Sequence, residues 1–394
     1  MTDESSSQVI ERVQLAVQHP TRPFRNATEL YSSRADADTS PHFELFDHSF
    51  LSILGEKPQL KVVTNFHTSE KWHSEKGGEK WLFAHEAPVW VPGADEVWFC
   101  SYAGKYPSGW HEGTNVLSKF SLREVDDLWE SEEVIGVNLT TPAKVVPTPA
   151  LEMTNGGTWY NNQLLLVQSG RAHDHAPNLA LVSPNPPYEA TIILNNYFGR
   201  QFNSLNDATI HPKSRAIFVT DPSYGFVVGF RPTPQMPVQV YRFDPLSGDL
   251  RVVADGFHKA NGIAFSPDGK TAYIADSGAA CEDGYDSTRP ATVYAFDVSP
   301  DLRTQSFLNR RVFAYIDTVI PDGIAIDERG NVYVTSGDGV LVRVQPSGTL
   351  LGKIFIGFLS ANIAFAGDRL VILAEDRIFV ARLGVRGMDL DFWK

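Results

Sequence analysis

The stretch Asn203-Ser-Leu-Asn-Asp-Ala-Thr-Ile-His-Pro212 introduces a pattern that returns twice further along the chain. The later copies are Asn261-Gly-Ile-Ala-Phe-Ser-Pro-Asp-Gly269 and Asp322-Gly-Ile-Ala-Ile-Asp-Glu-Arg-Gly330. Each copy begins with an Asn or Asp, continues as a short alternating apolar run, and passes through a turn into a second apolar run. Alternation with a period of two, broken by turn residues, is typical of β-hairpins. The sequence therefore predicts a repeated hairpin that presents a side-chain oxygen at its start.

Related units begin at six places, at intervals of 40 to 69 residues. They start at Glu86, Asn155, Asn206, Asn261, Asp322 and Asn362. A repeat of about 50 residues is close to the size of a four-stranded propeller blade. Closing the blades into a ring protects strand edges that a flat sheet would expose. We therefore predict an all-β fold, a six-bladed β-propeller forming a single domain over residues 56–394. Residues 61–65 should close the ring by pairing with residues 378–382.

Residues 1–55 are polar and irregular, and we expect them to form an N-terminal extension. Within it, Gln8–Val17 has the spacing of a short amphipathic helix. The first residues do not form a basic and apolar secretion signal, and no apolar run is long enough to span a bilayer. We therefore expect a cytoplasmic protein with no membrane partner. The two cysteines, Cys100 and Cys281, are expected to be buried free thiols, which fits that location.

Composition and motifs exclude several function classes. The chain has 34 Lys and Arg against 47 Asp and Glu, a net charge of −13, and no basic stripe, so a nucleic-acid partner is not expected. The sequence also lacks a Gly-x-Ser-x-Gly elbow, a phosphate-binding glycine loop and a cysteine cluster. A small molecule is the expected partner, and the oligomeric state cannot be deduced.

Four of the repeat starts combine into a candidate metal site. The innermost strands of a propeller converge on its axis, so equivalent positions in different blades meet there. Two carboxylates and two amides would be contributed by Glu86, Asn206, Asn261 and Asp322. Such a hard oxygen set suits Ca²⁺ better than Mg²⁺, which prefers water-rich octahedral sites, or Zn²⁺, which prefers His and Cys. Asp322 is also the candidate general base, because it would lie beside a water activated by the ion.

Other residues have more than one interpretation. Asn155 and Asn362 fit turn residues or outer-shell ligands, and we favour turns. His85 fits a packing role or proton transfer, and we include it as a catalytic candidate. The run from His173 to His175 fits a metal pair, a substrate-facing lid or a solvated loop, and the solvated loop is the favoured interpretation.

Three insertions are too long to be hairpin turns, namely residues 168–178, 222–237 and 277–290. Long loops on a rigid scaffold commonly carry ligand contacts. We expect 168–178 and 277–290 to lie at the cleft entrance and to select the substrate. The candidate substrate contacts are Asn203, Asn206, His173 and Tyr224.

Five stretches together resemble the gluconolactonase and regucalcin (senescence marker protein) family, and in particular fungal lactonohydrolases. They are His85–Trp90, Leu194–Asp207, Val252–Gly256, Asn261–Gly269 and Ile320–Gly323. The resemblance runs from about residue 45 to the C-terminus. It implies a six-bladed propeller with a calcium-type site in an axial cleft.

The resemblance also assigns roles to individual residues. Glu86, Asn261 and Asp322 match the family's metal ligands, and Asn206 matches a position that binds metal or substrate. Asp322 would in addition be the general base.

The leading hypothesis is metal-dependent hydrolysis of a lactone by a cytosolic enzyme of fungal specialised-metabolite biosynthesis. Because similar fungal proteins act as non-hydrolytic cyclases, including hetero-Diels–Alder catalysts, a pericyclase on the same scaffold is the alternative. A third possibility is a propeller that binds without catalysis. We disfavour it, because a scaffold does not need four oxygen ligands on one axis.

Overall fold

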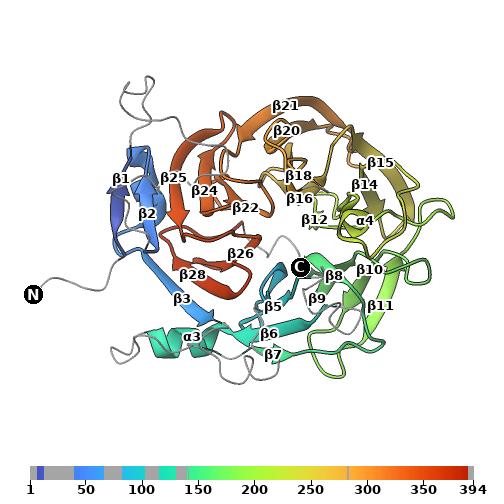
Figure 1. The fold of residues 1–394 in the computed structure, drawn as a ribbon, viewed down its shortest axis with the longest axis horizontal. Helices are drawn as coiled ribbons and strands as arrows, with labels where there is room; N and C mark the ends of the chain where they lie inside the picture. Colours follow the sequence, from blue (N-terminus) through green and yellow to red (C-terminus); the bar gives the residue numbers. More distant parts are fainter. Residues whose placement is uncertain are drawn as a thin grey trace, which may run out of the picture.

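The computed structural model describes residues 7–12, 40–65, 82–102, 115–129, 140, 142–281 and 284–388. Six antiparallel sheets radiate from a central axis (Figure 1). The predicted six-bladed β-propeller is therefore confirmed.

Each blade has four strands that run from the axis outward. The innermost strands are β4 (Glu86–Val91), β8 (Thr154–Tyr160), β12 (Ala208–Ile210), β16 (Ala260–Phe265), β22 (Ile324–Ile326) and β26 (Asn362–Ala366). The second strands are β5 (Glu96–Cys100), β9 (Gln163–Gln168), β13 (Ile217–Asp221), β17 (Thr271–Asp276), β23 (Val332–Ser336) and β27 (Arg369–Leu373).

The two outer positions follow in chain order in five blades, whereas the outermost strand of the last blade is β3, from the N-terminal end of the propeller. The third strands are β6 (Leu117–Ser121), β10 (Asn178–Val182), β14 (Gln239–Asp244), β20 (Thr292–Val298), β24 (Gly339–Val344) and β28 (Arg377–Arg382). The outermost strands are β7 (Ala143–Lys144), β11 (Ala190–Leu194), β15 (Asp249–Asp255), β21 (Phe307–Tyr315), β25 (Thr349–Phe355) and β3 (Gln59–Asn65).

The core lies between neighbouring blades, because both faces of each middle strand are covered. Phe218 of β13 and Tyr273 of β17 are at most 1% exposed. Phe218 contacts Phe265 of the next blade edge to face, with ring centroids 4.8 Å apart. Packing of this kind, repeated around the ring, fixes the angle between blades and so the position of every inner strand.

The ring closes by joining the two ends of the propeller sequence. Strand β3 pairs antiparallel with β28, and Lys61 lies opposite Val380. The predicted pairing of residues 61–65 with residues 378–382 is confirmed.

Part of the N-terminal extension continues one blade outward. Strand β2 (His42–Leu45) pairs with β25, and β1 (Val9–Glu11) pairs parallel with β2. The predicted helix over residues 8–17 is wrong for Val9–Glu11, because the backbone of this segment bonds to a sheet edge. Residues 13–17 lie outside the described residues. Phe43 of β2 is fully buried, so the edge strand adds to the core.

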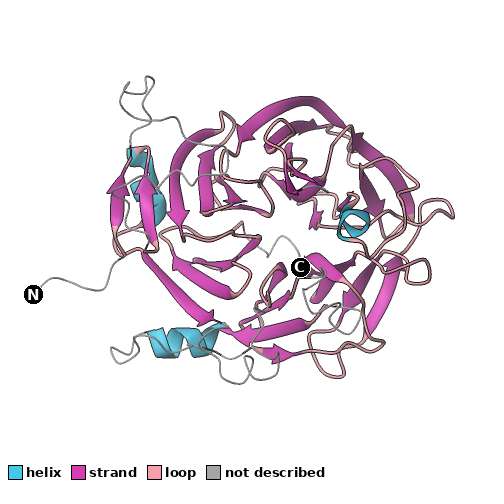
Figure 2. Ribbon diagram, viewed as in Figure 1, coloured by secondary structure: helices cyan, strands magenta, loops and turns pink. Residues whose placement is uncertain are grey.

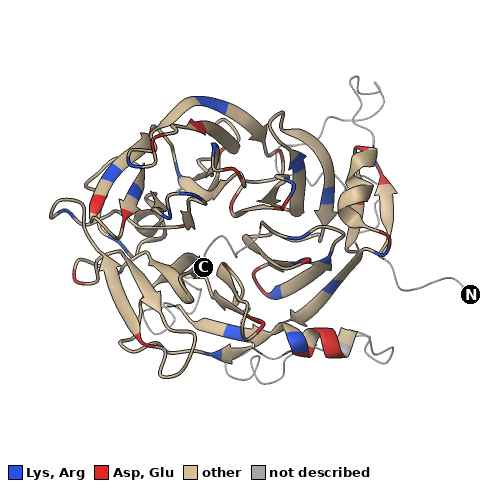
Figure 3. Ribbon diagram, turned by 180° about the vertical axis from the view of Figure 1, so that it is seen from behind, with Lys and Arg blue, Asp and Glu red and all other residues tan. Residues whose placement is uncertain are grey.

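The helices of the described residues are short. They are η1 (His48–Phe50), α1 (Leu51–Leu54), α3 (Leu122–Trp129) and α4 (Tyr224–Val228). Helix α4 lies inward of the outer strands of its blade, and the others lie at the rim of the ring (Figure 2). Across the described residues, no helix has the length and apolar character that crossing a bilayer requires. Basic and acidic residues are intermixed over the blades (Figure 3).

Both cysteines are free, as predicted. Cys100 is buried, whereas Cys281 is only half-buried, in the short hairpin β18 (Ala280–Cys281) and β19 (Gly284–Tyr285). The prediction that both thiols are buried is therefore correct for Cys100 alone.

Candidate functional site

The repeat motifs lie at one end of the axis, where regular strand pairing is interrupted. In β4 the register shifts between Glu86 and Val89, and in β16 it shifts between Ala260 and Ile263. Asn206 and Asp322 precede the first paired residues of their strands. A bulge or strand start releases side chains from strict alternation. Local irregularity therefore occurs in the backbone at or beside each of the four predicted ligands.

Glycines after the Asx residues let neighbouring blades approach closely. A Cβ on Gly262 would lie 2.2 Å from the Asp322 carbonyl oxygen, and one on Gly323 would lie 2.2 Å from Oδ1 of Asn362. These separations are far below van der Waals contact. The Asn-Gly and Asp-Gly pairs of these motifs therefore serve blade packing rather than turn formation.

Asn155 and Asn362 connect adjacent motifs. Nδ2 of Asn155 donates to the carbonyl oxygen of Asn206 at 3.1 Å, and Nδ2 of Asn362 donates to Oε2 of Glu86 at 2.6 Å. Both residues belong to inner strands, β8 and β26. The favoured prediction that they are turn residues is wrong, because both are strand residues that bond to the neighbouring blade, Asn155 within a bulge of β8 and Asn362 at the regularly paired start of β26.

All four predicted metal ligands are buried, with exposed fractions between 2% and 8%. Oδ1 of Asn206 and Oδ1 of Asp322 have no hydrogen-bond partner within the described residues. The amide nitrogen of Asn261 donates to the Tyr224 hydroxyl at 3.2 Å and to the Ser277 hydroxyl at 3.0 Å. Its amide oxygen takes part in neither bond. Buried oxygens without partners are costly unless a ligand satisfies them.

Burial and neighbouring carboxylates raise the cost of ionising both acidic residues among these ligands. Burial, and then the charge of Asp322, raise the pKa of Glu86 well above its ordinary value. Burial, followed by the charges of Glu375 and Asp207, raises the pKa of Asp322 well above its ordinary value. Two carboxylates held together in a buried site favour a cation or a shared proton.

Sequence reasoning missed two members of this cluster. Asp207 accepts from the backbone N–H of Ala208 at 2.8 Å and of Ile263 at 3.1 Å, and burial still raises its pKa to about 7. Its place directly after Asn206 could have marked it. Glu375 lies between β27 and β28 and belongs to no motif, so only ring closure shows that it joins the site.

The donor set fits a hard divalent cation. It offers carboxylate and amide oxygens, and two of those oxygens lack partners. Within the described residues, no three His, Cys, Asp or Glu side chains form a metal-binding group on their own. Any ion held at this end of the axis would therefore depend on the amide oxygens of Asn206 and Asn261. This dependence favours Ca²⁺ over Zn²⁺.

His85 lies beside this cluster and is paired with Glu375. Its Nδ1 lies 2.9 Å from Oε1 of Glu375, and its ring packs edge to face against Tyr102. Burial acts to lower the pKa of His85, but the Glu375 and Glu86 carboxylates together outweigh it, so this pKa lies above its ordinary value. Glu375 is itself held by backbone bonds to Ala84 in both directions and has a φ of 65°.

Tyr224, a predicted substrate contact, lies at the cluster. It is the first residue of α4, and its hydroxyl accepts from Asn261. Burial, together with the charge of Asp322, raises the pKa of Tyr224. The phenol therefore stays protonated and can donate a hydrogen bond.

Asn203 has a different environment from the one predicted. Its Nδ2 donates to the carbonyl oxygens of Met236 and Pro237, at 3.0 and 3.3 Å. Its Oδ1 accepts from the backbone N–H groups of Gln235 and Met236, both at 3.2 Å. The amide anchors this loop through all four bonds, and its role as a substrate contact stays a prediction.

His173 is exposed at the tip of the hairpin closed by the Arg171–His175 bridge. In the described part of the chain, no side-chain hydrogen bond links it to the predicted ligands. Its placement agrees with the favoured solvated loop, and its role as a substrate contact stays a prediction.

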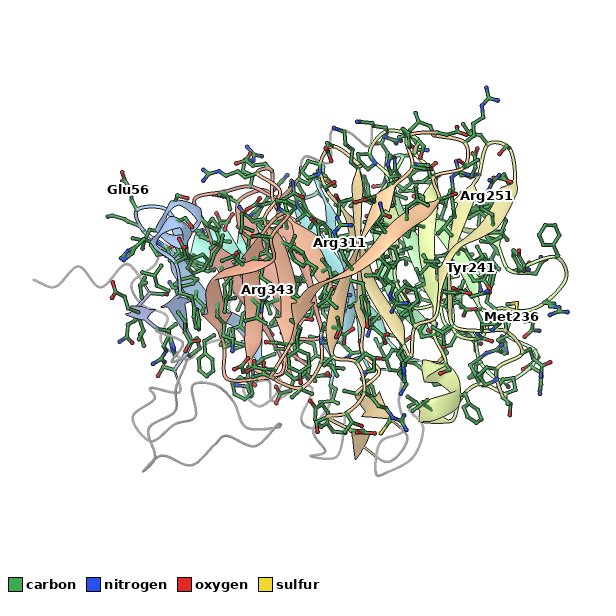
Figure 4. The ribbon with its side chains drawn as sticks, turned by 90° about the horizontal axis from the view of Figure 1, so that it is seen from above. Glu56, Met236, Tyr241, Arg251, Arg311 and Arg343 are labelled. Atoms are coloured by element: carbon green, nitrogen blue, oxygen red, sulfur yellow. The ribbon has the colours of Figure 1, made fainter. Side chains whose placement is uncertain are left out.

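The predicted insertions lie at the same end as the motifs. Gln168, where the first insertion begins, pairs with Thr154, and Asp276 pairs with Ala260. Figure 4 shows α4 and the β18–β19 hairpin projecting from the same side of the ring. The prediction that 168–178 and 277–290 share the face of Asp322 is confirmed.

A cavity of about 150 Å³ continues along the axis beyond the polar cluster. All six inner strands and Met388 line it, and most of the contributing side chains are apolar, such as Ile263, Ile324 and Ile363. The axis is therefore polar at the loop-bearing end and mainly apolar beyond it.

Comparison with known proteins identifies the family. The sequence model described as the SMP-30/Gluconolactonase/LRE-like region matches residues 85–374. The chain belongs to this family. The resemblance deduced from the sequence motifs is thereby confirmed.

Named relatives agree with that assignment. The lactonohydrolase oryH of Aspergillus oryzae is 28% identical over 415 aligned positions, which cover 86% of this chain and 80% of the relative. A gluconolactonase from Xanthomonas campestris has the same fold, with a TM-score of 0.63 and 22% identity over 92% of this chain and 99% of that one. Regucalcin from Agrobacterium tumefaciens, a calcium-binding protein, gives a TM-score of 0.51 and 17% identity over 79% and 92% of the two chains. The protein is thus lactonase-like.

Proposed function

We propose that this protein hydrolyses a lactone with the help of a divalent cation, most simply Ca²⁺. Glu86, Asn206, Asn261 and Asp322 would hold the ion. The observation that carries the proposal is the pair of buried Oδ1 atoms, on Asn206 and Asp322, that lack partners within the described chain. The relatives named as lactonohydrolase and gluconolactonase support hydrolysis as the reaction.

The surrounding residues orient the proposed ligands before substrate arrives. Asn362 donates to Glu86, and Asn261 donates to Ser277 and to Tyr224. A cation bound here would polarise the lactone carbonyl and lower the pKa of a water. Because these side chains are fixed by hydrogen bonds, little reorganisation would be needed when charge develops on the carbonyl oxygen.

Proton transfer is assigned to two residues. Asp322 accepts a proton from the attacking water as the new carbon–oxygen bond forms. The ring ester bond then breaks, and the departing alkoxide takes a proton to give a hydroxy acid. We assign that donation to Nε2 of His85, because Nδ1 faces Glu375. Tyr224 would hydrogen-bond to the substrate.

A lactone panel with and without chelator tests the proposal. Turnover should require a divalent cation and should return when Ca²⁺ is restored. Isothermal titration should show one cation site that Asp322→Asn weakens. Full turnover in chelator, or no turnover of any lactone with Ca²⁺ bound, would contradict the proposal.

The proposed setting is a route of fungal specialised metabolism in the cytoplasm. The fungal origin of the oryH relative supports it. Neighbouring genes for polyketide or terpene synthases would agree with this setting, and cell fractionation would test the location.

A further inference from the structure

Arg231 occupies the centre of the loops at the site end of the β12–β15 blade. It is 7% exposed. Its Nε donates to the carbonyl oxygen of Asn203 at 3.0 Å. Its Nη2 donates to the carbonyl oxygen of Phe202 at 3.2 Å and to Oε1 of Gln201 at 3.1 Å. The guanidinium thus fixes the segment that leads into the Asn206 motif.

The same side chain reaches the preceding blade. Nη1 donates to the carbonyl oxygen of Ala172 and, at 3.4 Å, to that of His175. The N–H of Ala172 in turn donates to the carbonyl oxygen of Phe230 at 2.8 Å. The acceptors of these three bonds are the backbone carbonyl oxygens of Ala172, His175 and Phe230. The bonds therefore hold the hairpin whatever side chains it carries.

The aliphatic stem of Arg231 packs on α4. A Cβ on Gly225 would lie 2.3 Å from Cγ of Arg231, and the backbone N–H of Arg231 donates to the Gly225 carbonyl at 2.8 Å. Gly225 follows Tyr224, whose hydroxyl contacts Asn261. One buried side chain therefore contacts the hairpin, the segment before Asn206 and the helix that carries Tyr224.

We infer that Arg231 is a positioning residue. It fixes how the 171–175 hairpin and Tyr224 lie relative to the predicted ligands, and so governs substrate binding. This inference rests on the proposed function. Asp221 supports the same segment, because it accepts from the N–H groups of Asn203 and Ser204 at 3.0 and 2.8 Å. A lysine would keep the charge but lacks the planar fork that reaches both blades.

Arg242 is a matched control in the same blade. It is 2% exposed and donates to the Leu302 carbonyl at 2.9 Å and to Gln305 at 3.1 Å. Those partners belong to the connection between β20 and β21, at the end of the ring away from the motifs. Arg242→Lys therefore removes a comparable set of bonds without touching the site.

The experiment compares full-length wild type, Arg231→Lys and Arg242→Lys by hydrogen exchange and by lactone kinetics. We expect exchange in residues 171–175 and 224–228 to quicken about tenfold or more in Arg231→Lys alone. KM should rise while kcat changes less. In a Tyr224→Phe background, the effect of Arg231→Lys on KM should fall to less than half, because the two residues act through one contact.

Unchanged hydrogen exchange of residues 171–175 and 224–228 in Arg231→Lys would overturn the inference. So would effects of Arg231→Lys and Tyr224→Phe on KM that simply multiply in the double variant. If Arg231→Lys fails to fold, Gly225→Ala displaces the aliphatic part of the Arg231 side chain and keeps its guanidinium. The same exchange measurement on Gly225→Ala then tests the inference. Absence of lactone turnover in wild type would refute the proposed function only, since exchange is read without substrate.

Discussion

The blades from β8 to β21 and the blades from β22 to β28 differ in how their middle strands are joined. In the first group, long connections follow β9, β13 and β17 at the motif end, and they include α4 and the β18–β19 hairpin. In the second group, only residues 337–338 join β23 to β24, and only residues 374–376 join β27 to β28. The three blades from β8 to β21 thus form an elaborated half of the ring and the two blades that begin at β22 and β26 form a plain half, while the β4–β7 blade belongs to neither.

The two halves contribute different chemistry. Asp322 and Glu375 come from the plain half. Glu375 lies in the short turn between β27 and β28, and the backbone N–H of Asp322 donates to the Thr335 hydroxyl of β23 at 3.1 Å. Tyr224, Asn206 and Asn261 come from the elaborated half. Residues that must hold charge within tenths of an ångström belong on short, rigid segments, whereas loops vary the substrate without moving the scaffold. The comparison therefore assigns the general base to the plain half and selectivity to the loops of the elaborated half.

The largest expected effect is at Asp322. Asp322→Asn keeps an oxygen ligand but removes the base and one charge, so hydrolysis should fall by about 10²–10⁴-fold from loss of general-base catalysis. Turnover of lactones by wild type and variant, each with Ca²⁺ and with chelator, measures it.

The same experiment separates hydrolysis from cyclisation. A pericyclase that orients neutral reactants has no water to activate. Retained turnover of the native substrate both in Asp322→Asn and in chelator would refute the metal-hydrolase proposal and favour the cyclase.

The next effect tests whether the plain half is as rigid as its turns imply. In Gly323→Ala, the new methyl group would lie 2.2 Å from Oδ1 of Asn362, which donates through Nδ2 to Glu86. Displacing this support should weaken cation affinity and activity about 10–100-fold. Titration calorimetry with Ca²⁺ measures the affinity.

Gly93→Ala is the control, because a Cβ there meets no atom within 4 Å. It should bind Ca²⁺ like wild type. Unchanged affinity in Gly323→Ala would show that the site tolerates movement of Asn362.

The elaborated half should control substrate choice. Replacing residues 278–290 with the corresponding loop of a relative, and keeping Ser277 because its hydroxyl accepts from the ligand Asn261, should alter the ranking of kcat/KM among lactones by about 10–200-fold. Cation affinity should stay within a factor of about three, because no proposed ligand belongs to the insertion. An unchanged ranking, or lost cation binding, would break the division between the two halves.

The sequence alone predicted the fold and the position of the site at the starts of the inner strands. Alternating apolar runs and recurring motifs indicate which residues belong to an inner strand. The sequence did not predict Glu375 or Arg231. Their contacts join segments that ring closure or loop folding brings together, and no local pattern marks them. It also misassigned Asn155 and Asn362, since an Asn at the start of an inner strand and an Asn in a turn look alike. What distinguishes the two cases is a contact with the neighbouring blade, and the sequence does not show that contact.

The smallest effect concerns stability at the end of the elaborated blades away from the site. His211 Nδ1 accepts from the N–H groups of Lys213 and Ser214, while Nε2 lies 2.9 Å from the Gly269 carbonyl oxygen in the next blade. Burial lowers the pKa of His211 to about 4, from an ordinary value of 6.5. Protonation would break both bonds to Nδ1.

A depressed histidine pKa means that the unfolded chain binds the proton more readily than the folded one. The stability contributed by neutral His211 is thus present above about pH 6.5 and is lost as pH falls toward 4. Asp207 and Asp221, whose pKa values burial raises to about 7, act in the opposite direction over the same range. The pH dependence of the wild-type unfolding free energy therefore cannot isolate the contribution of His211. The difference between wild type and His211→Gln can, because the aspartates are common to both.

Urea unfolding at pH 7 and pH 5 should show wild type losing about 2 kcal/mol more than His211→Gln over this interval. Parallel losses would mean that His211 does not remain neutral in the folded state. The predicted divergence would place a rigid, acid-sensitive contact between the β12–β15 and β16–β21 blades. The variability of the elaborated half would then be restricted to its loops at the motif end, and would not extend through the blades that carry them.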